Sequence, residues 1–349
     1  MYGSISIKKR LLWSSIALTS MLLAGCGSNG QNTNSTSTDT TAANSSTNGT
    51  AAGGDVKSVT IGYTPTIVLP QPLVGLQKGE YAKQVPGVTF GSTLYEAGSG
   101  VIEALRSGVI DIGASGPYPA LKAYAKSGDI VLLANAANGG TELMVSKSGP
   151  VKTIKDLKGK AVGVNQVGST VDAMVRYNLL QAGLKPDTDV RIVQVAPGEQ
   201  AATLQGGQIA GVAAPAPWPS QVAAKGNGRP LIDWKQILDN GNYSAGSIYT
   251  TKKFADAHPD FIKKFVAAHQ AITDALNKDR TKGDADVLAA WSAVSKKTLD
   301  PAVAKAAFAT IKYTTDPDPK NLQRFADIAF QVGVLKKKAD LTGFVYTAK

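Results

Sequence analysis

Three short turns in this chain combine glycine with hydroxyl residues directly before a helical pattern. Gly98-Ser99-Gly100 precedes an amphipathic run that Gly108 ends, and Ser115-Gly116 precedes a run with proline in its first turn. Gly168-Ser169-Thr170 repeats the pattern, with Asp172 at the spacing of a capping box. The N-termini of such helices carry unpaired N–H groups and partial positive charge, so they can hold a small anion without a charged side chain.

Each turn taken singly also fits an ordinary strand-to-helix connection, because short glycine patterns are weak signals. The recurrence of the pattern favours a binding role. We expect ligand contacts from Thr66, Ser99, Gly100, Ser115, Gly116, Gly140, Thr141, Ser169, Thr170 and Trp218. The hydroxyl residues also fit helix caps, Gly140 and Thr141 fit a hinge, and Trp218 fits core packing. An acidic side chain in place of Ser169 is expected to abolish binding with little effect on the stability of the free protein.

The elements around these turns follow an α/β pattern, because short apolar strands alternate with helical runs. Strands are expected near 59–63, 88–95, 109–112, 130–134, 161–164, 190–195 and 209–214. The chain is extended again over 243–250 and then helical to its end. We therefore predict an α/β fold with a mostly parallel sheet in each of two lobes.

The repeat of the strand, glycine turn and helix scheme in the second half predicts a hinged clamshell. Lobe 1 is expected to comprise residues 56–145 plus 246–349, and lobe 2 residues 146–245. The helical tail has no further strand-and-turn pairs, so it most simply completes lobe 1. Two crossings between the lobes are expected, near Leu143–Val145 and Ala245–Ile248.

The first 25 residues have the features of a lipoprotein signal peptide. The basic segment Lys8-Lys9-Arg10 precedes an apolar run over 11–23 that is short for a bilayer span. Leu23-Ala24-Gly25-Cys26 resembles a bacterial lipobox, which implies cleavage before Cys26 and lipid on its sulfur. Cys26 is the only cysteine, so disulfides within the chain are excluded. Residues 26–55 predict a disordered polar tether at the extracytoplasmic face of a cell membrane, as on a Gram-positive surface.

Composition fits a globular folded part rather than a nucleic-acid-binding one. Hydrophobic residues make up 43% of the sequence, which is enough for a sizeable core. The formal net charge is +11, and the chain stays basic after the signal is removed. The lysines and arginines are scattered, apart from the run Lys336-Lys337-Lys338, so we interpret them as solvated surface and expect no nucleic-acid partner.

The order of several segments resembles the solute-binding receptors of ABC importers for sulfonates, taurine and nitrate. The matching segments are 98–105, 107–113, Leu157-Lys158-Gly159-Lys160, Gly168-Ser169-Thr170 and the helix start Ala257-His258-Pro259-Asp260. The resemblance covers nearly the whole folded region and implies a type II periplasmic-binding-protein-like fold. It also implies a monomer that binds a small oxyanion between its lobes and delivers it to the transmembrane subunits of an ABC permease.

Two segments depart from the pattern of that family. Ala210-Gly211 stands where the family usually has Asp-Ala, and Pro215-Ala216-Pro217 followed by Trp218 replaces a usual Trp-Asp/Glu-Pro. These changes alter the expected wall of lobe 2, so a neutral or aromatic solute, such as a pyrimidine vitamin precursor, remains an alternative ligand.

An enzyme is a weaker interpretation of the same residues. The two histidines, His258 and His269, are not spaced for a two-histidine metal site on a helix, and no nucleophile motif occurs. We expect no cofactor, no metal and no catalytic residue. A structural surface lipoprotein would not need paired glycine turns in two lobes.

Overall fold

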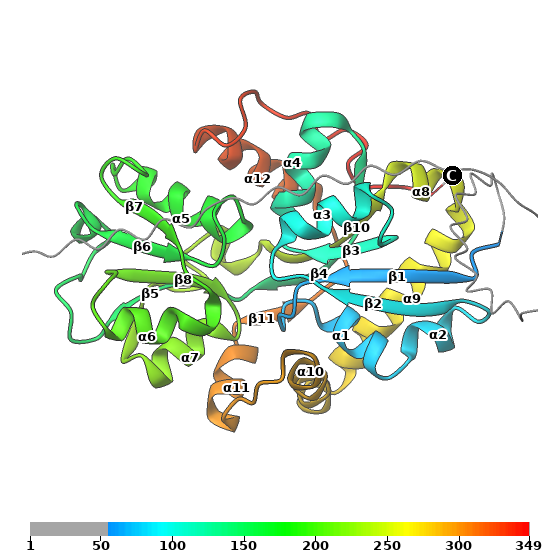
Figure 1. Ribbon diagram of the computed structural model, residues 1–349, viewed down its shortest axis with the longest axis horizontal. Coiled ribbons are helices and arrows are strands. Elements are labelled where there is room, and N and C mark those ends of the chain that lie inside the picture. The colour runs from blue at the N-terminus through cyan, green and yellow to red at the C-terminus, as the bar shows by residue number, and fades with distance from the viewer. Residues whose placement is uncertain (1–54, 349) are drawn as a thin grey trace, which may run out of the picture. The chain divides into compact units, whose positions relative to one another are not determined.

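Two β-sheets organise residues 55–348, which are the residues that the computed structural model describes (Figure 1). The predicted signal peptide, Cys26 and all but the last residue of the predicted tether lie outside this range. Within it, none of the helices combines the length and the apolar character that a membrane span requires.

The first sheet has six strands in the order β11-β4-β10-β3-β1-β2. Strands β1 and β2 and strands β1 and β3 pair in parallel, whereas β10 runs antiparallel to β3 and β4, and β11 antiparallel to β4. The bounds are β1 Ser58–Tyr63, β2 Thr89–Leu94, β3 Ile112–Ser115, β4 Ile130–Gly139, β10 Ser244–Thr251 and β11 Ile311–Tyr313.

The second sheet has five strands in the order β7-β6-β8-β5-β9. Strand β6 pairs in parallel with β7 and β8, and β5 runs antiparallel to β8 and β9. The bounds are β5 Thr141–Ser146, β6 Ala161–Val164, β7 Arg191–Gln194, β8 Gly211–Pro215 and β9 Gly228–Ile232. We use lobe 1 for residues 58–139 and 244–313, which hold the first sheet, and lobe 2 for residues 141–232, which hold the second.

The predicted α/β architecture with two sheets is confirmed, but each sheet is mixed rather than mostly parallel. The strands that carry the glycine turns, β1 to β3 and β6 to β8, form parallel pairs as expected. Every antiparallel pair includes at least one of β4, β5, β9, β10 and β11. Because these strands lie at the crossings between the sheets or arrive from the distant tail, no local strand-helix-strand pattern specifies their direction.

Helices connect the strands, and several begin with proline or end with glycine as the sequence indicates. The α-helices are α1 Pro70–Gln77, α2 Glu80–Gln84, α3 Gly98–Arg106, α4 Pro117–Ser127, α5 Thr170–Gln181, α6 Gln200–Gln205, α7 Trp218–Lys225, α8 Lys252–Ala257, α9 Pro259–Lys278, α10 Arg280–Ser295, α11 Pro301–Phe308 and α12 Pro319–Gln331. Three short 3₁₀-helices are η1 Ile154–Leu157, η2 Pro197–Glu199 and η3 Asp239–Gly241.

The strand expected at Val109–Ile112 begins only at Ile112. Gly108 adopts a left-handed φ of 73° after α3, and the Val109 amide donates a hydrogen bond of 3.0 Å to the Ala104 carbonyl. This hydrogen-bonded end of the helix uses residues that the apolar pattern assigned to the strand. The side chain of Val109 is 62% exposed as a result.

The chain passes from the first sheet to the second at Gly139 and Gly140, a few residues before the predicted crossing. Both glycines have positive φ, 85° and 80°. A Cβ on Gly139 would lie 2.4 Å from the Thr310 carbonyl oxygen, so the backbone needs glycine here for space as well as for conformation. The return passes through residues 233–243, before β10, rather than within it.

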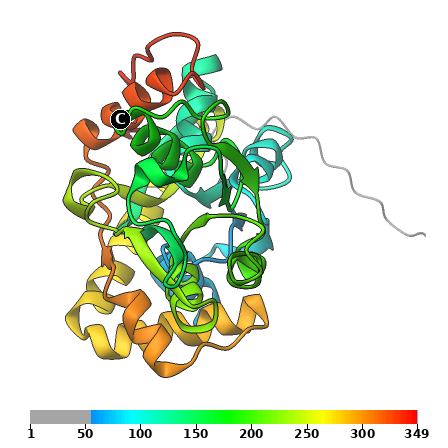
Figure 2. The same ribbon diagram turned by 90° about the vertical axis from the view of Figure 1, so that its left-hand side faces the viewer.

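The helical tail contacts both lobes instead of completing lobe 1 alone. Strand β11, which the sequence did not indicate, adds an edge to the first sheet beside β4, whereas α11 packs on α7 and α12 packs on α5. Figure 2 shows the orange helix α11 at the bottom of the view and the red C-terminal segment at the top.

Candidate binding cleft

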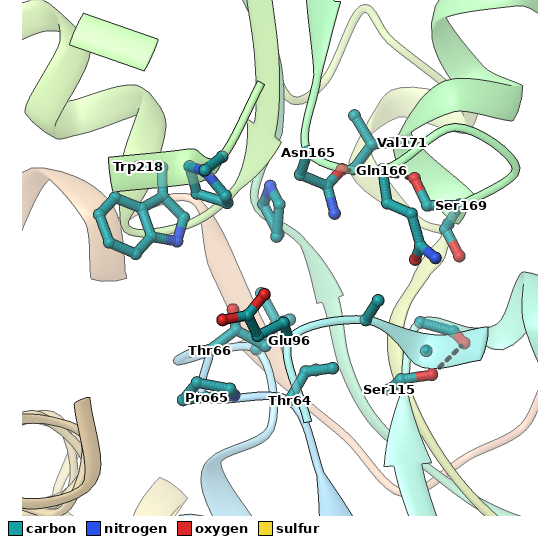
Figure 3. Close-up of a pocket in the computed structure, with 18 of the residues that line it drawn as sticks. Thr64, Pro65, Thr66, Glu96, Ser115, Asn165, Gln166, Ser169, Val171 and Trp218 are labelled. Atoms are coloured by element: carbon teal, nitrogen blue, oxygen red, sulfur yellow. Dashed lines mark hydrogen bonds between the residues drawn. The ribbon is translucent and has the colours of Figure 1, made fainter. Parts of the chain in front are cut away.

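A cavity of about 550 Å³ lies between the two lobes (Figure 3). Segments that directly follow β1, β2 and β3 form the wall from lobe 1, and segments that follow β6, β7 and β8 form the wall from lobe 2. Because the ends of parallel strands meet at one edge of each sheet, the topology brings these segments together. The lining residues are Thr64, Pro65, Thr66, Val68, Glu96, Ala97, Gly98, Ser115, Gly116, Pro119, Thr141, Asn165, Gln166, Ser169, Thr170, Val171, Gln194, Ala196, Pro197, Gly198, Glu199, Pro215, Trp218, Ala245 and Lys297.

Most of the predicted ligand-binding residues lie at this cavity. Its lining includes Thr66, Ser115, Gly116, Thr141, Ser169, Thr170 and Trp218. Among the described residues, Ser99, Gly100 and Gly140 lie outside the lining. Gly140 belongs to the crossing, where a Cβ would meet Ile311 and Val68 at 3.3 Å. The Ser99 hydroxyl accepts a hydrogen bond of 2.8 Å from Gln166 Nε2, so it links the two lobes.

Helix α3 presents a donor-rich N-terminus to the cavity. Its first three residues are Gly98, Ser99 and Gly100, and its N-cap, Ala97, provides no side-chain cap. The first N–H groups of a helix have no carbonyl partner within it, so these amides can donate to a ligand. A Cβ on Gly98 would lie 2.7 Å from Ser115 Oγ, which explains why glycine begins this helix.

Helix α4, in contrast, has few donors left for an anion. Pro117 and Pro119 have no N–H, and the Tyr118 amide donates a hydrogen bond of 3.2 Å to Thr170 Oγ1 in lobe 2. A Cβ on Gly116 would lie 2.4 Å from the same oxygen atom. The Ser115 hydroxyl lies 2.6 Å from the Tyr249 hydroxyl. The second glycine turn therefore contacts the opposite lobe, and its expected amide donors are largely absent or already paired.

Helix α5 supplies the corresponding terminus from lobe 2. The hydroxyl of its N-cap, Ser169, accepts a hydrogen bond of 3.3 Å from the Asp172 amide, and Asp172 Oδ2 accepts one of 2.6 Å from the Gly168 amide. The Ser169 hydroxyl caps α5 at the predicted spacing, but Asp172 accepts from the Gly168 amide instead of the Ser169 amide, so the second hydrogen bond of a capping box is displaced by one residue. Burial raises the pKa of the Asp172 carboxyl, and the Gly168 amide and the Arg176 guanidinium, 2.7 Å away, oppose that rise. Replacement of Ser169 would thus cost stability, contrary to the expectation from sequence.

Several hydroxyls at the cavity already have protein partners. Thr66 Oγ1 donates a hydrogen bond of 2.8 Å to the Ala216 carbonyl, and Ser169 Oγ donates one of 3.3 Å to Asn165 Oδ1. That contact leaves the N–H groups of the Asn165 amide as donors, and Figure 3 shows this side chain extending into the cavity. Side-chain amides and backbone N–H groups are therefore the principal neutral donors of the site.

Trp218 combines the two roles that its sequence context allowed. It is 9% exposed and packs edge to face on Trp291, with ring centroids 6.1 Å apart, yet it also lines the cavity. The Lys297 ammonium lies 4.7 Å from the Trp218 ring centroid, as in a cation–π contact. A ligand would therefore share this ring with Lys297.

Comparison with known proteins identifies the family to which this chain belongs. A model of the NMT1-like family matches residues 52–293, which is more than half of the sequence. The chain belongs to the NMT1-like family.

Relatives of this NMT1-like protein include two from Escherichia coli K12. A putative aliphatic sulfonates-binding protein is 27% identical over 294 residues, covering 77% of this chain and 86% of the relative. A taurine-binding periplasmic protein is 30% identical over 191 residues, covering 53% and 56%. Among solved structures, the alkanesulfonate-binding protein SsuA from Xanthomonas axonopodis, bound to MOPS, aligns with a TM-score of 0.71 at 23% identity over 85% of this chain and 99% of that one. This likeness confirms the periplasmic-binding-protein fold.

Sequence reasoning missed several lining residues of this NMT1-like protein. Asn165 and Gln166 directly follow β6, and Glu96 follows β2 by two residues, so their positions after strands could have identified them. Lys297 does not follow a strand, so its position in the sequence does not indicate that it lines the cavity. It lies in the segment between α10 and α11 and reaches the cavity only because the tail packs beside lobe 2.

Proposed function

We propose that this protein is an extracytoplasmic solute-binding receptor of an ABC importer that captures a small oxyanion of the sulfonate, taurine or nitrate type. The observation that carries the proposal is the approach of two helix N-termini, α3 from lobe 1 and α5 from lobe 2, to one cavity. Amides at helix N-termini favour bound negative charge and pay little desolvation cost because they are neutral. The names of the similar sulfonate- and taurine-binding proteins support this ligand class over a neutral or aromatic one.

The same proposal assigns the protein's place in the cell and its partners. The receptor would be anchored to the membrane through lipid on Cys26, carry its folded part on the tether, act as a monomer and deliver its solute to permease subunits without chemical change. Ligand contacts are proposed for the lining residues Ser169, Thr170 and Thr141 and for the first amides of α3. Trp218 would contact the part of the ligand remote from the oxyanion.

Thermal unfolding of the purified full chain with nitrate, bicarbonate, ethanesulfonate and taurine tests the proposal. One of these ligands should stabilise the protein by about 2.7 kcal/mol at a hundredfold excess over its dissociation constant. The Ser169→Glu variant should lose this stabilisation, because a carboxylate at the α5 terminus would repel the oxyanion and occupy the cavity.

A second N-cap substitution separates loss of binding from loss of stability. Thr251 caps α8 by accepting a hydrogen bond of 3.0 Å from the Phe254 amide, and it lies outside the described lining of the cavity. Thr251→Glu should lose about 1 kcal/mol of folding stability, as should Ser169→Glu, but keep its ligand response. Mass spectrometry of solutes carried through purification would identify the ligand. If no oxyanion stabilises the protein and none co-purifies, the proposal is wrong.

A further inference from the structure

The charged side chains at the cavity do not match a ligand that is only an anion. Glu96 and Glu199 line it, and Lys297 is the single lysine or arginine among the lining residues of the described chain. The Lys297 ammonium is already placed over the Trp218 ring. Two carboxylates therefore face one partly engaged ammonium, although the helix termini of the same cavity favour negative charge.

The Glu96 carboxylate points into the cavity. Figure 3 shows its side chain beside Thr66 in lobe 1, with Asn165 on the opposite wall. Within residues 55–348, no side chain forms an ion pair with Glu96 at 4.0 Å or less, and its carboxylate accepts no hydrogen bond there.

Its position also argues against a role in capping α3. Glu96 precedes the N-cap residue Ala97, and helix α3 begins at Gly98 without a side-chain hydrogen bond at its cap. An acidic group that served the helix would accept from one of the first amides. The carboxylate is instead directed into the space that a ligand on those amides would share.

We propose that the ligand is a zwitterion, an aminoalkanesulfonate or a molecule of the same charge pattern, and that Glu96 is the residue that selects its cationic group. The inference rests on the proposed function, because it assumes that the oxyanion occupies the helix termini. The ammonium then lies toward Glu96, with Glu199 on the facing wall contributing the same sign of potential. A net-neutral ligand satisfies both halves of the cavity, whereas a simple alkanesulfonate offers the exposed Glu96 carboxylate no cation to pair with.

A matched pair of ligands tests the inference by isothermal titration calorimetry on the full chain. The pair is 2-aminoethanesulfonate and 1-propanesulfonate, in which a methyl group replaces the ammonium. The wild-type protein should bind the amino compound at least tenfold more tightly. Glu96→Gln should reduce that ratio to about twofold or less, mainly by weakening the amino compound, and Glu96→Asp should retain a preference of the same sign.

Glu103→Gln provides the control, because this substitution removes the same charge. Glu103 lies on the exposed side of α3, outside the lining of the cavity. The variant should keep the wild-type ratio. Equal or tighter binding of 1-propanesulfonate to the wild type, or an unchanged ratio in Glu96→Gln, would overturn the inference while leaving the proposed receptor function intact. Failure of both sulfonates, together with nitrate and bicarbonate, would overturn the proposed function itself.

Discussion

Replacement of Glu142 by glutamine should stabilise the protein above neutral pH and leave it unchanged in acid. Glu142 lies on β5 just after the crossing at Gly140, and it is 9% exposed. Burial raises the pKa of its carboxyl from the usual 4.5 to about 7, the nearby Asp233 adds to the rise, and the Trp234 backbone amide opposes it. In the unfolded chain, the same carboxyl is ionised above its usual pKa.

The sign follows from the protons that each state binds. Between pH 4.5 and pH 7, the folded state keeps the Glu142 proton and the unfolded state has lost it, so the free energy of unfolding falls as pH rises. The difference between the pKa of Glu142 in the folded state and in the unfolded state corresponds to a loss of about 3 kcal/mol in the free energy of unfolding by pH 8. Glutamine keeps the shape and an acceptor oxygen but does not ionise, so the variant should regain most of that loss at pH 8.

His269 opposes this trend in the wild-type protein. Its ring is fully buried, Nε2 donates to the Asn135 carbonyl at 2.9 Å, and Nδ1 accepts from the Tyr81 hydroxyl at 3.0 Å. Burial lowers its pKa from 6.5 to about 4, so the folded state excludes a proton that the unfolded state binds. Stability contributed by the neutral ring is therefore complete above pH 6.5 and is lost as pH falls toward 4. Between about pH 4.5 and 6.5, the opposite effects of Glu142 and His269 on the free energy of unfolding cancel. In Glu142→Gln, stability should therefore rise with pH over this range because only the His269 effect remains.

Urea unfolding of the full chain at half-unit steps from pH 4.5 to pH 8 measures both effects. The difference between Glu142→Gln and the wild type should grow from near zero to about 3 kcal/mol across this range. Glu103→Gln replaces an exposed carboxyl on α3, and its difference from the wild type in unfolding free energy should not grow with pH. A difference that is constant with pH, or larger in acid than at pH 8, would refute the assignment of the raised pKa to Glu142.

Three further predictions concern two contacts between the lobes and the N-cap of α5. Gly116→Ala should weaken ligand binding at least tenfold by titration calorimetry, because its Cβ would lie 2.4 Å from Thr170 Oγ1, while the free protein stays folded by circular dichroism. Thr170→Val should lower the free energy of unfolding by about 1 kcal/mol in urea, since the Tyr118 amide loses its acceptor, and Thr170→Ser should restore it. Ser169→Ala should cost a similar amount, about 1 kcal/mol, through loss of the hydrogen bond from the Asp172 amide, and Ser169→Thr should recover most of it.

The positions of the glycine turns were predictable because they depend on local signals. Gly98 begins α3 and Ser169 caps α5 shortly after a strand has ended, and parallel pairing then places both at the cavity. The sequence did not indicate that Thr170 would accept from α4, since that contact depends on how the lobes face each other. The two prolines at 117 and 119 were a usable signal, because they remove two of the donors expected at the α4 terminus.

The remaining differences arise from long-range packing. The Lys297 ammonium reaches Trp218 through the fold of the tail, and the direction of β10 is set by partners more than a hundred residues away. A strand that is buried on both faces looks the same in sequence whichever way it runs. The presence of two sheets was therefore predictable from the sequence, but their antiparallel strand pairs and the position of the crossing at Gly139 were not.

All three glycine turns contribute hydrogen bonds between the lobes, and the turns before α3 and α5 are also proposed to bind the ligand. Hydrogen bonds join Gln166 to Ser99, Tyr118 to Thr170, and Lys122 to the Gly168 carbonyl, and each has one partner in each lobe. All three lie where the β6–α5 turn meets α3 and α4, beside the termini proposed to hold the oxyanion. A ligand that bridges α3 and α5 stabilises the same arrangement as these bonds, so its affinity includes the free energy of forming them. Substitutions at the α4 turn should therefore change affinity without removing a ligand contact, whereas substitutions at Glu96 should change which ligand is preferred.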